Sequence, residues 1–352
     1  MKRYSAAVYG GSGYLGSEAV RRLLGHPEVE LAHVYAADHI GEPLAAALPN
    51  LEGKTALRFE AVPEAGTPSV DILLLALPHE VSHRVVAGAI RSAVRIIDMS
   101  GAFRVDDAAS YEKFYGAPHP LPELLPEFLY GLPELARERL RGARLVASPG
   151  CFATTIELGL LPLARAGWLS GAVQTVGMTG SSGAGVTPTP TTHHPTRSKN
   201  LRAYRPLLHT HAPEIREALL RAGARDLEVD FVPVAAPLSR GILATSFASV
   251  PEEVDAARLR AAFTASYAAE RFVIMPEKRL PEVVAVAGSN YAEVGFALGE
   301  PRLMGGARCR VVTAISALDN LVKGGAGQAI QNLNLMLGLE ESLGLTDAAA
   351  YP

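Results

Sequence analysis

Residues 4–38, YSAAVYGGSGYLGSEAVRRLLGHPEVELAHVYAAD, decide the fold of the first part of this chain. Apolar residues predict a buried strand at the start and another over residues 30–37, and an amphipathic spacing between them predicts a helix. A glycine turn, GGSGYLG, joins the first strand to that helix. Two more apolar runs, over residues 70–77 and 95–99, predict strands that flank a second helix. Strands that alternate with helices indicate a parallel sheet with right-handed crossovers, so we expect an α/β domain of the Rossmann type.

The pattern of the sequence changes after residue 150. Residues 172–312 contain β-rich runs such as VQTVGMTG and GILATSFASV, together with a long loop rich in Pro, Thr and His. Two helical patterns, over residues 214–222 and 255–270, lie between these runs. The mixture predicts an α+β domain on a mixed or antiparallel sheet. A last pattern, over residues 318–339, reads as one more helix.

Length and composition limit the possible functions. A chain of 352 residues favours two domains, which we place at residues 1–150, completed by residues 319–352, and at residues 151–318. The 33 basic and 36 acidic residues give a net charge of −3 without a basic stripe, which argues against a nucleic-acid partner. No apolar run approaches the ~18 residues of a membrane span. The two cysteines suit neither a disulfide framework nor a metal site, so we expect no metal and a cytoplasmic location.

The glycine turn has the spacing G-x-x-G-x-x-G between a strand and a helix. Glycine allows a tight turn and a close approach of the backbone to a pyrophosphate, whose charge the N-terminal end of the helix stabilises. The pattern therefore predicts a dinucleotide site. Asp38, after the second strand, could bind the ribose 2′-hydroxyl of NAD, whereas His39 could meet the 2′-phosphate of NADP. The candidate residues of the turn are Gly10, Gly11, Ser12, Gly13, Tyr14, Leu15 and Gly16.

Cys151 follows Pro149 and Gly150 in SPGCFATTIELGLLPLARAG, at the start of a predicted helix. A helix N-terminus favours a thiolate, and its free N–H groups can stabilise an oxyanion. We therefore predict that Cys151 is a nucleophile rather than a packing residue. Cys309 lies inside an apolar strand pattern and is expected in the core.

A thiol nucleophile needs a group that moves protons, usually a histidine. The sequence HTHAPEI places His209 and His211 just before a helix that Pro213 and Glu214 are expected to open. A second pair, in TTHHPTR, lies in the long loop. The first pair is the better candidate, because a helix-entry loop holds its side chains in a fixed direction.

Ser100 and Arg104, in IIDMSGAFR, follow the end of a predicted strand, where open α/β sheets bind ligands. Arg104 either clamps a phosphate bidentately or is an ordinary surface arginine. Together with a nicotinamide site and a cysteine nucleophile, an oxyanion-binding arginine indicates thioester chemistry between the acyl and aldehyde levels.

Ten blocks in order along the chain, among them GGSGYLG, SPGCFATT, HTHAPEI and DNLVKGGAGQAIQNLN, resemble the N-acetyl-γ-glutamyl-phosphate reductases of arginine biosynthesis, within the aspartate-semialdehyde dehydrogenase superfamily. The resemblance implies an oxidoreductase that uses NADPH and a small acyl phosphate, with a dinucleotide-binding domain and a catalytic and oligomerisation domain that forms a homodimer or homotetramer. It implies that Cys151 is the nucleophile and His209 the acid/base, and that His211 and Glu214 line the site. Asn320, expected to open the last helix, matches the position that contacts the nicotinamide.

Alternatives remain at the level of the substrate and the cofactor. A sister group acts on aminoadipyl or glutamyl phosphate tethered to a small acidic carrier protein, in lysine or arginine biosynthesis, and this chain resembles it in TTHHPTR and GSNYAEVGF. The stretch YAADHIG replaces the Ser or Arg usual in the family after the second strand, which leaves NAD possible. Aspartate-semialdehyde dehydrogenase uses the same parts. A non-catalytic redox sensor that binds a dinucleotide would have an unreactive Cys151.

Overall fold

The computed structural model describes residues 2–63, 66–92 and 94–351, so residues 1, 64, 65, 93 and 352 of the predicted domain ranges lie outside it. The chain divides into two compact units. Unit 1 comprises Met1–Gly150, Gly185–Thr187 and Gly325–Asp347. Unit 2 comprises Cys151–Ala184, Pro188–Gly324 and Ala348–Pro352.

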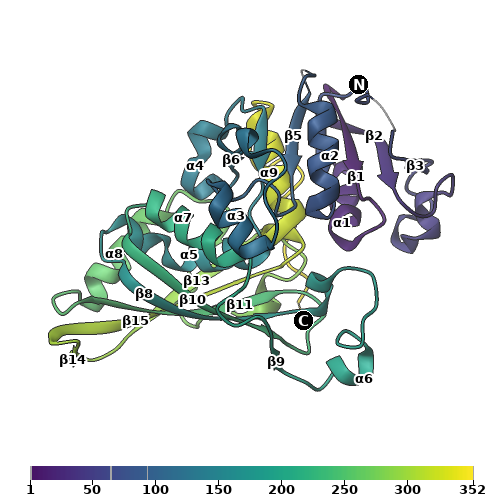
Figure 1. Ribbon diagram of the computed structural model, residues 1–352. Helices are drawn as coiled ribbons and strands as arrows, with labels where there is room; N and C mark the ends of the chain where they lie inside the picture. The colour runs from purple at the N-terminus through teal and green to yellow at the C-terminus, as the bar shows by residue number, and fades with distance from the viewer. Residues whose placement is uncertain (1, 64–65, 93, 352) are drawn as a thin grey trace. The chain divides into compact units, whose positions relative to one another are not determined.

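Unit 1 is built on a parallel sheet that has seven strands in the described residues, in the order β3-β2-β1-β4-β5-β7-β6 (Figure 1). The order reverses between β1 and β4, which creates the crevice at the carboxyl ends of the strands where open α/β sheets bind ligands. The predicted Rossmann-type sheet is therefore confirmed. Its elements are β1 (Tyr4–Tyr9), α1 (Tyr14–Leu24), β2 (Val29–Ala36), β3 (Phe59–Ala61), β4 (Ile72–Leu75), α2 (His79–Ala89), β5 (Arg95–Asp98), α3 (Ala108–Tyr115), β6 (Leu129–Tyr130), α4 (Pro133–Leu140), β7 (Leu145–Ala147) and α9 (Gly327–Met336).

The C-terminal helix α9 completes unit 1 by packing against α1 and α4. Two polar contacts fix it there: the His26 ring lies with its Nε2 2.9 Å from the Asn334 side-chain oxygen, and Asn332 donates to the Gly131 carbonyl over 2.8 Å. The side chains of His26, Asn332 and Asn334 are buried, so these contacts pair polar groups that would otherwise be costly inside the unit.

Unit 2 is built on a mixed sheet in the order β12-β13-β15-β11-β8-β10-β9, with β14 paired to β15. Strands β8 and β10 run parallel, whereas β11 is antiparallel to both β8 and β15, which confirms the predicted mixed sheet. Helices α5, α7 and α8 cover one face of this sheet (Figure 1). The elements are α5 (Cys151–Arg165), β8 (Ser170–Thr179), α6 (His194–Arg197), β9 (Arg202–Ala203), α7 (His211–Arg221), β10 (Arg225–Ala235), β11 (Ile242–Pro251), α8 (Ala256–Tyr267), β12 (Val273–Ile274), β13 (Ala292–Leu298), β14 (Arg302–Met304) and β15 (Ala307–Leu318).

Helix α5 is the centre of unit 2. Every residue from Phe152 to Ala164 is buried, because the helix contacts the sheet as well as α7 and α8. Pro162 has no N–H and so leaves the carbonyl of Leu158, four residues earlier, without its helical partner. The hydroxyl of Tyr267 on α8 donates to that carbonyl. The helix thus stays continuous, and its first residue is held in a fixed place.

The sequence pattern misplaced the starts of two helices. The expected helix over residues 318–339 is regular only from Gly327 to Met336, because Val322–Ala326 form a π-helical turn in which Gly325 has non-helical φ and ψ angles of −162° and −106°. The expectation that Asn320 opens this helix is wrong for the same reason. Helix α7 begins at His211 rather than at Pro213, since a proline is tolerated within the first turn, where its missing N–H has no helical partner.

Candidate active site

The glycine turn of unit 1 is too tight for a side chain at two of its glycines, Gly10 and Gly16. Gly10 has a positive φ of 81°, and a Cβ there would lie 2.2 Å from the Ala76 carbonyl oxygen. A Cβ on Gly16 would lie 2.0 Å from the Gly10 carbonyl oxygen. A Cβ on Gly13, by contrast, would come no closer than 3.5 Å to another atom, so the missing side chain at this position leaves the turn open. The turn fits a pyrophosphate that approaches the backbone.

Helix α1 begins directly after this turn, with Tyr14 and Leu15 as its first two residues. Gly13 is the N-cap and supplies no side-chain cap, and the first turn of the helix contains no acidic residue. The helix end therefore keeps its positive character for an anionic ligand. Asp38, the candidate ribose ligand, accepts a 2.6 Å hydrogen bond from the Ser12 hydroxyl, which brings the end of β2 to the glycine turn.

Ser100 and Arg104 lie buried after β5 in unit 1, and hydrogen bonds to neighbouring residues hold both side chains. The Ser100 hydroxyl donates to the carboxylate of the fully buried Asp98 over 2.8 Å. Arg104 donates to the carbonyls of Ser148 (2.8 Å) and Met99 (2.6 Å). The arginine is therefore not an ordinary surface residue. These two bonds link the segments that follow β5 and β7, at the carboxyl ends of the strands.

Cys151 is the first residue of α5 and is partly exposed, unlike the buried Cys309 in β15. The carbonyl of Cys151 accepts a 2.7 Å bond from the Thr155 hydroxyl, and the Thr155 carbonyl accepts one of 2.6 Å from Ser316. Two hydroxyls thus hold the first turn of the helix. The predicted location of Cys151 at a helix N-terminus is confirmed.

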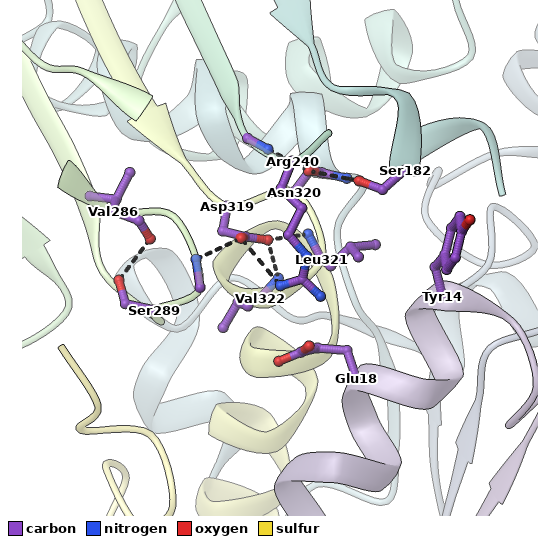
Figure 2. A network of polar contacts seen from close by, with 12 residues as sticks. Tyr14, Glu18, Ser182, Arg240, Val286, Ser289, Asp319, Asn320, Leu321 and Val322 are labelled. Atoms are coloured by element: carbon purple, nitrogen blue, oxygen red, sulfur yellow. Dashed lines mark hydrogen bonds and ion pairs between the residues drawn. The ribbon is translucent and has the colours of Figure 1, made fainter. Parts of the chain in front are cut away.

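A turn after β15 is organised by Asp319, whose side chain is fully buried (Figure 2). The Asp319 carboxylate accepts hydrogen bonds from the backbone N–H groups of Leu321 (2.8 Å), Val322 (3.1 Å) and Gly288 (2.7 Å). It also forms an ion pair with Arg240 over 3.4 Å. A buried carboxylate with this many donors fixes the backbone that follows it.

This turn rests against the cysteine. The N–H of Gly324 donates to the Asp319 carbonyl over 2.9 Å, and a Cβ on Gly324 would lie only 2.9 Å from the Cβ of Cys151. Asn320, the predicted nicotinamide contact, accepts a 2.7 Å bond from the Gly241 N–H and donates to the Ser182 hydroxyl over 3.0 Å (Figure 2). In this arrangement the amide of Asn320 joins three loops of unit 2.

A pocket of about 330 Å³ in unit 2 opens onto Cys151. It brings together three of the sequence-predicted residues: Cys151, His209 and His211. Glu214 is not among its lining residues; it lies buried in the first turn of α7. The remaining lining residues are Phe152, Thr179, Gly180, Gly183, Ala184, Thr191, Thr192, Arg197, Arg202, Tyr204, Thr210 and Ala235.

The pKa of His209 is strongly perturbed in this pocket. Burial, followed by the charge of Arg205, lowers it to about 4. The aromatic rings of Phe152 and Phe231, with centroids 5.6 and 5.2 Å from that of His209, account for the loss of water. Its Nδ1 accepts a 3.2 Å bond from the His211 N–H, so the neutral ring carries its proton on Nε2. His209 is therefore a neutral N–H donor at pH 7.

Sequence reasoning missed the residues that the long loop and β9 bring to the pocket. Tyr204 is the clearest case: burial, followed by the nearby Cys151, raises its pKa to about 12. Arg197 and Arg202 also line the pocket. Arg197 ends the stretch TTHHPTR, in which only the histidine pair was considered, and no motif marks Arg202 or Tyr204. The course of this loop depends on the sheet beneath it.

Within the described residues, no group of three or more His, Cys, Asp and Glu side chains is arranged to hold a metal ion. The helices of the described residues include none with the length and hydropathy needed to cross a membrane.

The two units match two models of one protein family. Residues 5–143 match the NAD-binding domain of semialdehyde dehydrogenases, and residues 151–320 match their dimerisation domain. The first match makes unit 1 a domain for a nicotinamide dinucleotide. Solved structures agree on the fold. Aspartate-semialdehyde dehydrogenase II of Vibrio cholerae has a TM-score of 0.71 at 16% identity, covering 96% of this chain and 99% of its own. Aspartate-semialdehyde dehydrogenase of Candida albicans has a TM-score of 0.65 at 14% identity, covering 97% and 99%.

Sequence relatives define the family more closely. The chain is 40% identical over 349 residues to the N-acetyl-γ-glutamyl-phosphate reductase of Azotobacter vinelandii, covering 98% of each chain. It is 41% identical over 355 residues to a putative LysW-L-2-aminoadipate 6-phosphate reductase of Thermomicrobium roseum, covering 99% of each. The glycine turn of unit 1 and the Cys151 pocket of unit 2 thus lie in a chain that belongs to the N-acetyl-γ-glutamyl-phosphate reductase family of the semialdehyde dehydrogenases.

Proposed function

We propose that this protein reduces N-acetyl-γ-glutamyl phosphate to N-acetyl-glutamate semialdehyde and phosphate, as a step of arginine biosynthesis in the cytoplasm. The observation that carries the proposal is the pocket that holds Cys151, at the start of a fixed helix, together with the neutral His209. The relative from Azotobacter vinelandii, which bears the name of this activity, supports the choice of substrate. Unit 1 is assigned to the cofactor, and unit 2 to catalysis and to a homodimer or homotetramer.

The reaction begins when Cys151, as the thiolate that the N-terminal end of α5 favours, attacks the acyl carbon. A C–S bond forms, the C–O bond to phosphate breaks, and phosphate leaves. The nicotinamide, when bound, supplies the hydride that brings the thioester to the aldehyde level. Covalent catalysis suits this substrate because a thioester accepts hydride far more readily than a carboxylate does.

His209 stabilises the negative charge that develops on the substrate oxygen. Its Nε2–H faces the developing oxyanion as a donor, and the lowered pKa of the ring keeps it neutral until that charge forms. When the C–S bond breaks, the sulfur leaves as the thiolate and the oxygen becomes the aldehyde carbonyl. His211 orients His209 through its backbone N–H, and Glu214 stabilises the N-terminal turn of α7 that carries His211.

We assign the leaving phosphate to Ser100 and Arg104. Arg104 is held by bonds to the carbonyls of Ser148 and Met99 at the carboxyl ends of β5 and β7, which is where open α/β sheets bind ligands. Gly10 to Gly16 would hold the pyrophosphate of the cofactor, and Asn320 would contact the nicotinamide.

We propose NADPH as the reductant, as the resemblance to the family implies. Asp38 favours NADH as a second candidate, because a carboxylate after β2 binds a ribose hydroxyl and repels a 2′-phosphate. We expect D38S to lower kcat/KM for NAD at least about tenfold relative to that for NADP, since one charge-assisted hydrogen bond is lost and one repulsion is removed. An unchanged ratio of the two cofactors in D38S would remove Asp38 from the 2′ site.

The decisive test of the function is the reverse reaction. N-acetyl-glutamate semialdehyde is incubated with inorganic phosphate and NADP or NAD. Formation of the reduced nicotinamide is followed by its absorbance at about 340 nm. We expect turnover that requires phosphate. Turnover of the carrier-bound semialdehyde alone would instead support the second candidate, which the relative from Thermomicrobium roseum favours.

Gly324→Ala tests whether the turn after β15 positions the nucleophile. The added Cβ would meet Cys151 Cβ at 2.9 Å and Leu318 Cδ1 at 3.0 Å, so we expect Cys151 to shift and kcat to fall about 10²-fold, as for a misplacement of about 1 Å. Gly88→Ala is the matched control. That glycine lies in α2 with no atom near its Cβ position, so the variant should gain about 0.5–1 kcal/mol of stability and keep its activity. A fully active Gly324→Ala enzyme would contradict the positioning role.

A further inference from the structure

The pocket that holds Cys151 is lined by basic side chains, two of them arginines, without a carboxylate to balance them. Its titratable lining residues with a basic side chain are Arg197, Arg202, His209 and His211, and none of its lining residues is Asp or Glu. The sequence shows the same bias, because no acidic residue occurs between Glu157 and Glu214. A pocket of this kind attracts an anion.

Arg197 is the cation that is held most firmly. It is the last residue of α6, and its Nη2 donates to the carbonyl of Thr179, at the end of β8, over 2.8 Å. Its Nε is buried and has no hydrogen-bond partner among the described residues. Burial lowers the pKa of this guanidinium; Tyr204 opposes that shift, and Arg202 adds to it.

A guanidinium in this state is costly in the absence of a ligand. A buried donor without an acceptor loses its hydration without compensation, and the neighbouring charge of Arg202 adds repulsion. Both costs are removed when a carboxylate or phosphate enters the pocket beside Arg197. The single bond to Thr179 fixes the orientation of the planar group and leaves its other N–H groups for a bidentate contact.

We propose that Arg197 binds the α-carboxylate of the substrate and is the residue that selects for it. The inference rests on the proposed function. The acyl phosphate carries two anionic groups, and one of them, the phosphate, leaves at the acyl carbon and is assigned to Ser100 and Arg104. The α-carboxylate remains on the part of the substrate that stays bound to Cys151, so it needs a cation in the same pocket. Arg197 meets this requirement on the side of Thr179, and Arg202 strengthens the positive field.

The test combines a substitution with a change of substrate. The reverse reaction is measured for wild type and Arg197→Gln with N-acetyl-glutamate semialdehyde and with 4-acetamidobutanal, which is the same aldehyde without the carboxylate. We expect wild type to prefer the carboxylated aldehyde by about 10–100-fold in kcat/KM, the usual worth of a hydrogen-bonded charge pair. Arg197→Gln should lose this preference: kcat/KM falls by about the same factor for the first aldehyde, chiefly through KM, and stays within about twofold for the second.

A merely structural arginine would give a different result. Equal losses for both aldehydes in Arg197→Gln would overturn the proposal, and so would a wild-type enzyme that shows no preference between them. Lys199→Gln is the matched control, because Lys199 is an exposed cation of the same segment that does not line the pocket, and its preference should equal that of wild type. If Arg197→Gln does not fold by circular dichroism, Arg197→Lys carries the same comparison and should keep only part of the preference. If wild type converts neither aldehyde, the proposed function is wrong and this inference is wrong with it.

Discussion

Cys151→Ser is expected to lower kcat/KM by roughly 10³-fold or more, the largest effect of any single substitution in unit 2. A serine hydroxyl at the start of α5 would keep the geometry, because the first turn is held by Thr155 and Ser316 rather than by the sulfur. It would lose the chemistry, because an alkoxide is far less accessible than a thiolate and an ester accepts hydride less readily than a thioester.

The measurement has two parts. Steady-state reduction of the acyl phosphate gives the loss of rate, and mass spectrometry of protein mixed with acyl phosphate in the absence of NADPH shows whether an acyl group accumulates on the chain. Wild type should carry one acyl group on Cys151, and the serine variant none. Cys309→Ser should behave like wild type, since Cys309 is buried in β15.

Two outcomes would refute the covalent mechanism. One is a Cys151→Ser enzyme within about tenfold of the wild-type rate, since loss of a true nucleophile costs far more than that. The other is a wild-type Cys151 that iodoacetamide does not label at neutral pH, which is the behaviour expected of a redox sensor without catalytic function. Labelling of Cys151 ahead of the buried Cys309 supports the enzyme.

The sequence was sufficient for those parts of the site that depend on neighbours along the chain. The glycine turn after β1 and the cysteine that begins α5 are local features, because a backbone turn and a helix start are determined by a few consecutive residues. The two sheets followed from the alternation of strands and helices and from the β-rich second half. In each case the sequence pattern reflects a local energetic preference, and contacts with distant segments do not override that preference.

Features that depend on contacts between distant segments could not be predicted. The pattern after residue 318 is helical in composition, but a Cβ on Gly324 would lie only 2.9 Å from the Cβ of Cys151, and Gly325 then breaks the helix. Arg197 and Tyr204 reach the pocket from a loop without periodicity. The absence of acidic residues from this loop was a usable signal, because an acid-free stretch around a nucleophile indicates an anionic ligand.

His209→Asn is expected to lower kcat by roughly 10²–10⁴-fold, the usual contribution of one positioned acid or base. The structure also predicts that the lost group is the N–H donor at Nε2 of His209. The backbone N–H of His211 occupies Nδ1, so the ring presents Nε2–H to the substrate. His209→Gln places an amide N–H near the position of Nε2 and should therefore retain more activity than His209→Asn, whose amide is one bond shorter. His193→Asn, on an exposed histidine of the same unit that does not line the pocket, should be fully active.

The pH dependence follows from the direction of the pKa shift. Burial lowers the pKa of His209 to about 4, so the ring is neutral throughout the range from about pH 5 upward. In the profile of kcat/KM, wild type should show no break near the ordinary histidine pKa of about 6.5 and should lose activity only as the pH falls toward 4. The unfolded chain, whose histidine titrates near 6.5, takes up its proton first, so the stability contributed by the neutral ring is present above about pH 6.5 and is lost as the pH falls toward 4. The contrary result is a break between about pH 6 and 7, the range of a solvated histidine, that disappears in His209→Asn. It would show that His209 is protonated in the free enzyme and would reverse its assigned role. A cationic ring beside Cys151 would form an ion pair with the thiolate instead of donating a hydrogen bond from the neutral state.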